Sequence, residues 1–294
     1  MSKQKIIAFD VGGTSIKSGV VEGKEDLIGP IIQTPIHSKG TKDEILAVFQ
    51  SILNHHLEQI VPEIPTCLAL AIPGPFDYEN GISKIQGVQK YEAIYDFNLR
   101  TAFQTWLPHP DIPIFFCNDA EAAITGEAQC GVGATYKCAL GVTLGTGLGG
   151  AFMLDGIPQR TGKGVTSDGE IYYFKFNGEI GDDVFSIRGL SKRLKAAGLH
   201  YDSIQVASEA ARTNDLITLS VFKQFGTDFG IFLNQILADF EADAVLALGG
   251  ISNARDLFGA EVEAVIQRPF VQGILGQKAP LLGAVALAKI NHRL

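Results

Sequence analysis

Two glycine-rich segments in corresponding places of the chain constrain its fold more than any other feature. The first, IIAFDVGGTSIKSGVVE, covers residues 6–22, and the second, GVTLGTGLGGAFMLDG, covers residues 141–156. Both interrupt apolar, strand-like sequence with glycines, which weaken a sheet because they pack no side chain and lose the most entropy on folding. Taken by itself, the first segment is explained by a hairpin turn. The repetition favours two phosphate-binding turns, because backbone N–H groups of glycine-rich turns cradle phosphate.

The pattern around these turns predicts an α/β fold that repeats once. The expected strands of the first half are 5–9, 15–21, 27–33, CLALAI and IPIFFC, with a helix over 42–59. The second half begins with the second glycine hairpin and continues with helices, the strand AVLALGG and a last helix over 281–291. Strands that alternate with helices indicate mixed or parallel sheets that are covered on both faces.

We expect this repeat to form two domains. The first comprises residues 1–117 and the second residues 118–280, and a C-terminal helix within 281–294 is expected to pack back on the first domain. Ligands are expected at the carboxyl ends of the strands or between the halves.

The composition disfavours some classes of binding partner and indicates the cellular compartment of the protein. A net charge of -8 and a pI near 5.3 disfavour binding to nucleic acid, which needs a basic surface. Cys67, Cys117, Cys130 and Cys138 lie in or next to apolar segments without the spacing of metal ligands, which indicates reduced thiols. The N-terminus runs directly into a strand, and no apolar run reaches the length of about 18 residues that a membrane span needs. We therefore expect a cytoplasmic protein without a membrane partner.

A polar cluster follows the strand IPIFFC, in the stretch NDAEAAITGEA. Asn118 and Asp119 stand where this strand ends and a helix begins. Both residue types favour a helix N-cap. Asp119 would also suit a general base that takes a proton from a substrate hydroxyl, with Asn118 bonded to a neighbouring hydroxyl. The two interpretations are compatible. In the first glycine segment, Asp10 suits a carboxylate that holds a hydrated metal ion.

The chain resembles the ROK family (repressors, open reading frames and kinases) of the sugar kinase, actin and heat-shock ATPase superfamily. The resemblance covers nearly the whole chain and rests on motifs in family order: DVGGTSIK, AIPGPFDYENGI, NDAEAAITGEA, LGTGLGG, DGE at residues 168–170, LALGGISNA and APLLGAVALA. It implies two actin-like (ribonuclease H-like) α/β domains with mixed central sheets flanked by helices, and with ATP and sugar in the interdomain cleft. Only the resemblance suggests a homodimer.

The resemblance also implies which residues bind Mg-ATP. The phosphates would contact the first glycine turn, at Asp10, Gly12, Gly13 and Thr14, with Mg²⁺ held by Asp10 through water. They would also contact the second glycine turn, at Gly145, Thr146 and Gly147. The adenosine would lie near Gly249 and Gly250.

A second set of residues would hold the sugar. Asn118, Asp119 and Glu170 would bind it, and the loop that contains Gly74 would border it. Asp119 would be the base that activates the sugar hydroxyl for in-line attack on the γ-phosphate.

The chain departs from the family pattern where many members bind a structural zinc ion. Those members have a histidine three residues after the sugar-binding glutamate, where this chain has Tyr173, and the following FKFNGEIGDD contains no cysteine. Zinc needs thiolate or imidazole ligands, so no zinc site is expected. Tyr173 is either a sugar ligand or a packed aromatic residue. Asp182 takes the place of a sugar-binding glutamate in the family register, and a helix N-cap explains it equally well.

The sequence thus predicts an ATP-dependent hexose kinase, similar to a glucokinase. Glucose is the first expectation, and fructose, mannose and N-acetylhexosamines are alternatives. A repressor would need a helix-turn-helix domain before the first motif, and only nine residues precede Asp10. A non-catalytic sugar sensor is compatible with the missing zinc ligands, but it would not need the carboxylates of Asp10 and Asp119.

Overall fold

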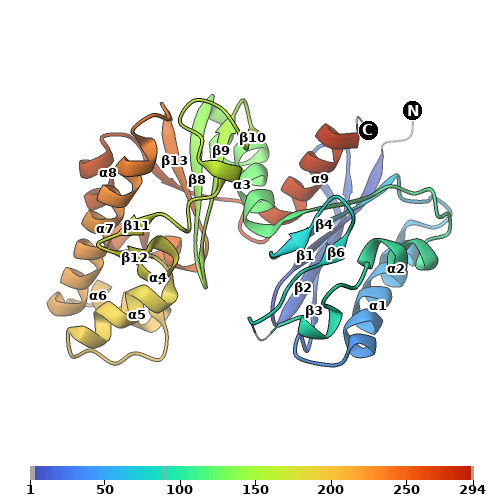
Figure 1. Cartoon of the computed structure of the whole chain (residues 1–294), viewed down its shortest axis with the longest axis horizontal. Coiled ribbons are helices and arrows are strands. Elements are labelled where there is room, and N and C mark those ends of the chain that lie inside the picture. Colours follow the sequence, from blue (N-terminus) through green and yellow to red (C-terminus); the bar gives the residue numbers. More distant parts are fainter. Residues whose placement is uncertain (1–3, 89, 293–294) are drawn as a thin grey trace. The chain divides into compact units, whose positions relative to one another are not determined.

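The computed structural model describes residues 4–88 and 90–292, which form two compact units (Figure 1). The first unit runs to Cys130 and resumes at Leu275, and the second is Gly131–Ile274. The division falls after Cys130, whereas the sequence suggested Cys117, because helix α3 (Asp119–Cys130) packs against helix α9 (Lys278–His292) of the same unit. Residues 293–294 of the expected C-terminal helix lie outside the described residues.

The sheet of the first unit has the strand order β3-β2-β1-β4-β7. Its strands are β1 (Lys5–Val11), β2 (Ser15–Glu22), β3 (Asp26–Pro35), β4 (Cys67–Ile72) and β7 (Ile114–Asn118). The strands β1, β2 and β3 form an antiparallel meander, and β4 and β7 run parallel to β1. All the strands predicted for the first half are therefore present, in one mixed sheet.

Helices cover both faces of this sheet, which explains why its central strands are apolar on both sides. Ile7 and Phe9 of β1 share one core with residues of α1 (Lys42–Ile60) and α2 (Leu99–Trp106). Ile6 and Ala8 alternate with them and share another core with α3 and α9. Asp10 continues the row of Ile6 and Ala8, so it belongs to the face that α3 and α9 cover.

The sheet of the second unit repeats this topology, in the order β10-β9-β8-β13-β14. Its strands are β8 (Cys138–Leu144), β9 (Leu148–Leu154), β10 (Ile157–Gln159), β13 (Ala244–Leu248) and β14 (Phe270–Gln272). Three antiparallel strands are again followed by two strands that run parallel to the first of them. The strand order therefore confirms the predicted repeat.

The core of the second unit is rich in phenylalanine. Four of these rings lie on one face of α7 (Leu216–Leu237) and are fully buried: Phe222, Phe225, Phe229 and Phe232. Among the described residues, α7 is the one helix long and apolar enough to span a membrane. Its buried phenylalanines identify it as a core helix.

The remaining elements are short. In the first unit, β5 (Phe76–Asp77) pairs with β6 (Ile82–Ser83). The second unit contains the hairpin of β11 (Lys175–Phe176) and β12 (Glu179–Ile180), and the helices α4 (Gly181–Val184), α5 (Ile187–Ala196), α6 (Ile204–Arg212) and α8 (Gly259–Ile266). The 3-10 turns are η1 (Glu92–Ile94), η2 (Val132–Thr135), η3 (Ser167–Gly169) and η4 (Gly250–Leu257).

Helices α3 and α9 approach each other closely at two glycines. A Cβ atom on Gly283 would lie 1.7 Å from the carbonyl oxygen of Ala122, and one on Gly126 would lie 2.0 Å from that of Ala279. Such distances are far below van der Waals contact, so glycine is required at both positions. Because α3 begins at Asp119, this packing also fixes the helix that carries the predicted base.

One histidine of α1 is buried. His56 is 1% exposed, with its Nε2 atom 2.8 Å from Oγ of Ser18 and its Nδ1 atom 3.1 Å from Oε1 of Gln59. Burial is the largest cause that lowers the pKa of His56 below 6.5, because desolvation disfavours the charged imidazolium. The folded protein therefore resists protonation at this site.

We expect the free energy of unfolding to fall as the pH drops below 6.5, because the unfolded chain then binds a proton that folded His56 does not. One such proton contributes at most about 1.4 kcal/mol per pH unit. The free energy of unfolding, measured with urea at neutral and at mildly acidic pH, should fall less on acidification in His56→Gln than in the wild type. His109, which is exposed in the same unit, provides the control, since the free energy of unfolding of His109→Gln should fall as much as that of the wild type. If the free energy of unfolding falls equally on acidification in His56→Gln and in the wild type, the prediction is contradicted.

Candidate active site

The predicted residues of the first unit gather at the carboxyl ends of the parallel strands β1, β4 and β7. Asp10 on β1 is in register with Ala71 on β4, and Ala71 is in register with Cys117 on β7. The first glycine turn, the loop with Gly74, and the pair Asn118 and Asp119 therefore follow these strands at one edge of the sheet. Open α/β sheets bind their ligands at such an edge.

Asp10 is a mostly buried carboxylate that pairs with a lysine. Its Oδ2 atom accepts a hydrogen bond from Nζ of Lys17 at 3.1 Å, and the two residues are direct cross-strand partners on β1 and β2. Burial raises the pKa of Asp10, and the charge of Lys17 lowers it in part. Protein-bound Mg²⁺ usually keeps several waters and takes one or two carboxylates beside substrate phosphates. Asp10 fits that role.

In the turn of Gly12, Gly13 and Thr14, side chains hold two carbonyl groups by hydrogen bonds. Two N–H groups have no acceptor among the described residues, and we call these open N–H groups. The carbonyl oxygen of Gly12 accepts a hydrogen bond from the hydroxyl of Tyr91, and that of Gly13 accepts one from the hydroxyl of Ser38. Within the described part of the chain, the N–H groups of Gly13 and Thr14 have no acceptor. This arrangement fits a phosphate cradle.

Asn118 and Asp119 make different hydrogen bonds at the start of α3. Asn118 caps α3, because its Oδ1 atom accepts from the N–H of Glu121 at 3.0 Å. Its Nδ2 atom lies 3.3 Å from the hydroxyl of Tyr78. Asp119 is the first residue of α3, and its Oδ1 atom accepts from the adjacent N–H of Ala120 at 2.9 Å. No hydrogen bond from another residue to its Oδ2 atom is present within residues 4–88 and 90–292.

The pKa of Asp119 is raised above its usual value of 3.8. Desolvation by burial is the largest cause; the N–H of Ala120 opposes it, the Asp10 carboxylate adds to it, and the charge of Lys90 opposes it. A carboxylate with a raised pKa accepts a proton more readily than an ordinary one. The electrostatics of Asp119 therefore suit a general base.

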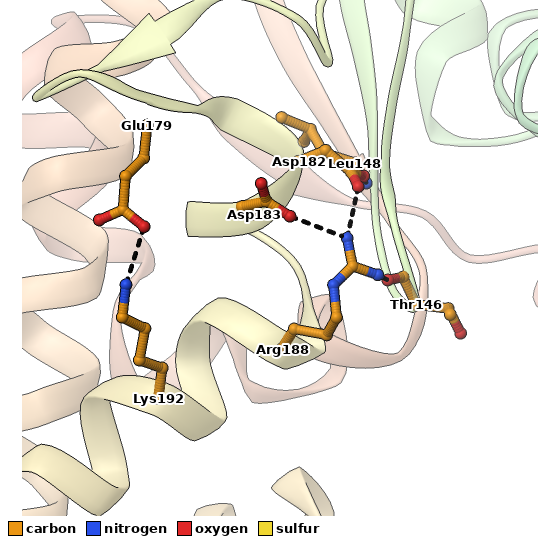
Figure 2. A network of polar contacts seen from close by, with 7 residues as sticks. All are labelled: Thr146, Leu148, Glu179, Asp182, Asp183, Arg188 and Lys192. Carbon is orange, nitrogen blue, oxygen red and sulfur yellow. Dashed lines mark hydrogen bonds and ion pairs between the residues drawn. The ribbon is translucent and has the colours of Figure 1, made fainter.

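The second glycine turn joins β8 to β9 and is fixed in a similar way. The carbonyl oxygen of Gly145 accepts from the N–H of Ile187 at 2.8 Å, and that of Thr146 accepts from Nη1 of Arg188 at 3.1 Å (Figure 2). As far as the structure describes the chain, no acceptor is bonded to the N–H groups of Thr146 and Gly147. Both turns thus combine carbonyl groups that are held by hydrogen bonds with open N–H groups.

Asp182 on α4 holds the other side of the second turn. Its Oδ1 atom accepts from the N–H of Leu148 at 2.7 Å, and its Oδ2 atom lies 2.6 Å from Nη2 of Arg188 (Figure 2). A Cβ atom on Gly147 would lie 2.8 Å from Oδ1 of Asp182, so this contact requires glycine in the turn. These contacts give Asp182 a part in positioning the turn, which neither interpretation of the sequence included. A sugar contact of Asp182 stays a prediction.

Gly249 and Gly250 lie at the same sheet edge as the second turn, because Leu248 of β13 is in register with Thr143 of β8. Gly249 has a φ of 90°, and a Cβ atom there would lie 2.4 Å from the carbonyl oxygen of Leu144. Only glycine tolerates both conditions. The position of these glycines near adenosine stays a prediction.

Tyr173 braces the segment that carries Glu170. The tyrosine is 38% exposed, and its hydroxyl donates to the carbonyl oxygen of Ser167 on η3 at 3.3 Å. Its ring packs against Tyr172, with 5.4 Å between the ring centroids. These contacts agree with a packed aromatic residue, and the sugar contacts of Tyr173 and Glu170 stay predictions. The side chain of Asp168 in the same motif lies outside the described residues.

A zinc site was not expected, and its absence stays a prediction. In the described ranges 4–88 and 90–292, no three side chains of histidine, cysteine, aspartate or glutamate are grouped so as to hold a metal ion.

Three residues that fix the glycine turns were not found from the sequence. Ser38 and Tyr91 lie far along the chain from the turn they contact, and Arg188 lies in an ordinary helical stretch. No motif marks them. Only their contacts with the carbonyl groups of the two turns identify them.

Comparison with known proteins places these sites in a family. The ROK family model matches residues 6–291. A beta-glucoside kinase from Listeria innocua is 31% identical over 161 residues, which are 54% of this chain and 50% of that protein, so the match spans about half its length. A glucokinase from Thermotoga maritima is 24% identical over 322 residues, covering 98% of each chain.

A solved structure agrees in fold. The crystal structure of a ROK family glucokinase from Streptomyces griseus, in complex with glucose and AMPPNP, is similar with a TM-score of 0.74 and 22% identity over 97% of this chain and 99% of that one. The likeness confirms the predicted α/β architecture with two mixed sheets flanked by helices. With the family model matched along nearly its entire length, the chain belongs to the ROK family.

Proposed function

We propose that the protein is an ATP-dependent hexose kinase, similar to a glucokinase, which transfers the γ-phosphate of Mg-ATP to a hydroxyl group of glucose. The observation that carries the proposal is Asp119, a carboxylate with a raised pKa, at the same sheet edge as the first glycine turn. Phosphoryl transfer to a hydroxyl requires a group that orients or deprotonates this hydroxyl and donors that hold the phosphates. Asp119 and the N–H groups of the first turn would supply them at this edge.

Asp119 would take the proton of the attacking hydroxyl. The N–H of Ala120 ties its Oδ1 atom, which fixes the carboxylate and leaves Oδ2 for the substrate. Asn118, fixed by its cap on α3, would bond a neighbouring hydroxyl through Nδ2. Positioning of the reacting groups supplies much of the rate in such transfers.

The two glycine turns would bind the phosphates through their open N–H groups. Gly13 and Thr14 supply these groups in the first unit, and Thr146 and Gly147 supply them in the second. Asp10 would hold Mg²⁺ through water, and the ion would offset negative charge on the phosphates. Lys17 would keep the Asp10 carboxylate in place.

The relatives support glucose as the sugar. Beta-glucoside kinase and glucokinase are both named for substrates with a glucosyl ring. Glu170 would bind hydroxyl groups of that ring. By the family resemblance, Tyr173 would replace a zinc-binding histidine and Asp182 a sugar-contacting glutamate. Fructose, mannose and N-acetylhexosamines stay alternatives because these replacements change the pocket.

The proposal is tested by coupled ADP release from Mg-ATP in the presence of single sugars. The panel is glucose, a β-glucoside such as cellobiose, fructose, mannose, N-acetylglucosamine and N-acetylmannosamine, with a reaction without sugar as the blank. We expect sugar-dependent turnover with the highest kcat/KM for glucose. If calorimetry detects sugar binding and no sugar gives ADP release, the proposal fails and the protein is a sugar sensor.

A further inference from the structure

We propose that Lys90 binds the terminal phosphoryl group of the nucleotide and is a second catalytic residue beside Asp119. This inference rests on the proposed kinase function. The supporting observations are the anchoring of the next residue, Tyr91, to the first glycine turn, the approach of the Lys90 side chain to Gly13, and the lack of a partner for its ammonium group among the described residues.

The residue after Lys90 is anchored to the first glycine turn. Tyr91 is 1% exposed, and its hydroxyl donates a hydrogen bond to the carbonyl oxygen of Gly12. Burial raises the pKa of Tyr91, so its hydroxyl stays protonated and can donate. Its backbone N–H donates to the carbonyl oxygen of Ser38 at 2.6 Å, and the hydroxyl of Ser38 in turn donates to the carbonyl oxygen of Gly13. The backbone beside Lys90 is therefore fixed to the turn by two routes.

The side chain of Lys90 lies beside the first glycine turn. A Cβ atom built on Gly13 would lie 3.8 Å from Cδ of Lys90, so the aliphatic stem is in contact range of the turn. The ammonium group lies close enough to Asp119 for its charge to lower the pKa of that carboxylate. Lys90 thus lies near both the first glycine turn and the proposed base.

The ammonium group of Lys90 is available for a ligand. Lys17 is paired with Asp10 at 3.1 Å. Among the described residues, Lys90 has neither an ion-pair partner nor a hydrogen-bond partner for its ammonium group. It is half-buried, so its charge is less screened by water than that of an exposed lysine.

A terminal phosphoryl group at the first turn would bring negative charge next to Asp10 and Asp119. Transfer of this group spreads negative charge over its peripheral oxygens, and a positioned cation stabilises that charge. The ammonium of Lys90 has three N–H donors for those oxygens. This role also explains why a lysine is held near the base without forming a direct ion pair with it.

The experiment compares Lys90→Met with Lys90→Arg and with Lys84→Met. Lys84 provides the matched control because it is an exposed lysine of the same connecting segment and pairs with Asp96. Calorimetry with the full chain measures the Kd of Mg-AMPPNP and of Mg-ADP, and the sugar assay measures kcat and KM. The ratio of the two nucleotide Kd values isolates the contact with the terminal phosphoryl group.

We expect Lys90→Met to weaken Mg-AMPPNP binding by about 10-fold or more, as for loss of a charge-assisted hydrogen bond, and to leave Mg-ADP binding nearly unchanged. In the sugar assay, kcat should fall by about 10²-fold with little change in the KM for sugar. Lys90→Arg should restore part of the nucleotide preference, and Lys84→Met should match the wild type. An unchanged ratio of Kd values in Lys90→Met, or equal weakening of both nucleotides, would overturn the assignment.

The nucleotide measurements also separate this inference from the kinase proposal. If the wild type phosphorylates no sugar but Lys90→Met still loses the preference for Mg-AMPPNP, the kinase proposal fails and the Lys90 contact stands. If the wild type phosphorylates sugar and Lys90→Met has normal kcat and a normal Kd ratio, the kinase proposal stands and Lys90 is not catalytic. If the wild type binds neither nucleotide, both fail.

Discussion

Replacing Asp119 by asparagine is expected to lower kcat by about 10²- to 10⁴-fold, which is the usual contribution of a general base. Asparagine has nearly the same shape, and its Oδ1 atom can still accept from the N–H of Ala120. Sugar binding should therefore be largely kept. Steady-state ADP release and calorimetry with the sugar measure the two effects separately.

The pH dependence of kcat/KM is a second test of the role of Asp119. Because burial raises the pKa of Asp119, the acidic decline of kcat/KM should lie above pH 3.8, and activity should rise as the carboxylate loses its proton. Asp77→Asn is the matched control, since hydrogen bonds from Asn80 lower the pKa of Asp77, which caps a turn in the same unit. Near-normal turnover in Asp119→Asn would show that Asp119 is not the base.

Gly283→Ala is expected to be the most damaging single change to the fold of the first unit. Its Cβ atom would meet the carbonyl oxygen of Ala122 at 1.7 Å, and the obstacle is helix backbone that no rotamer change can move. Overpacking of a rigid contact costs up to about 3 kcal/mol, and sometimes more. Thermal and urea unfolding should show this loss of unfolding free energy.

Ile290→Ala on the same helix is the control, because Ile290 is 41% exposed and its truncation should have a small effect. The shift of α3 against α9 in Gly283→Ala should also displace Asp119, the first residue of α3. Turnover should therefore fall even at temperatures where the variant is folded. A Gly283→Ala variant as stable and as active as Ile290→Ala would contradict the described packing of α3 on α9.

The central strands could be predicted because their apolar runs are determined locally. CLALAI coincides with β4 (Cys67–Ile72), and the helix expected over 42–59 is α1 (Lys42–Ile60). The last helix begins at Lys278, before the expected start at residue 281, because Pro280 is tolerated in a first helical turn, where its missing N–H has no intrahelical partner. Periodicity identified this helix but not its first turn.

The contacts of the site could not be predicted, because they join residues that are distant in sequence. The N-cap interpretation of Asp182 is wrong, because Ile180 is the N-cap of α4 and Asp182 is its second residue. The bonds of Asp182 to Leu148 and Arg188 depend on how α4 packs beside the second turn. Tyr91 has a left-handed φ of 57°, which no local pattern announces for a tyrosine. The glycine motifs mark where phosphate would bind, and tertiary contacts supply the residues that hold those turns.

Direct detection of the transferred group tests the central claim. ATP labelled with ¹⁸O in its γ-phosphoryl group is incubated with Mg²⁺, glucose and the wild-type protein, and the products are resolved by mass spectrometry, with Asp119→Asn alongside. The proposed function predicts a hexose phosphate that carries the label, formed much more slowly by Asp119→Asn. Labelled inorganic phosphate without any labelled hexose phosphate, or no cleavage of ATP with glucose, would contradict it.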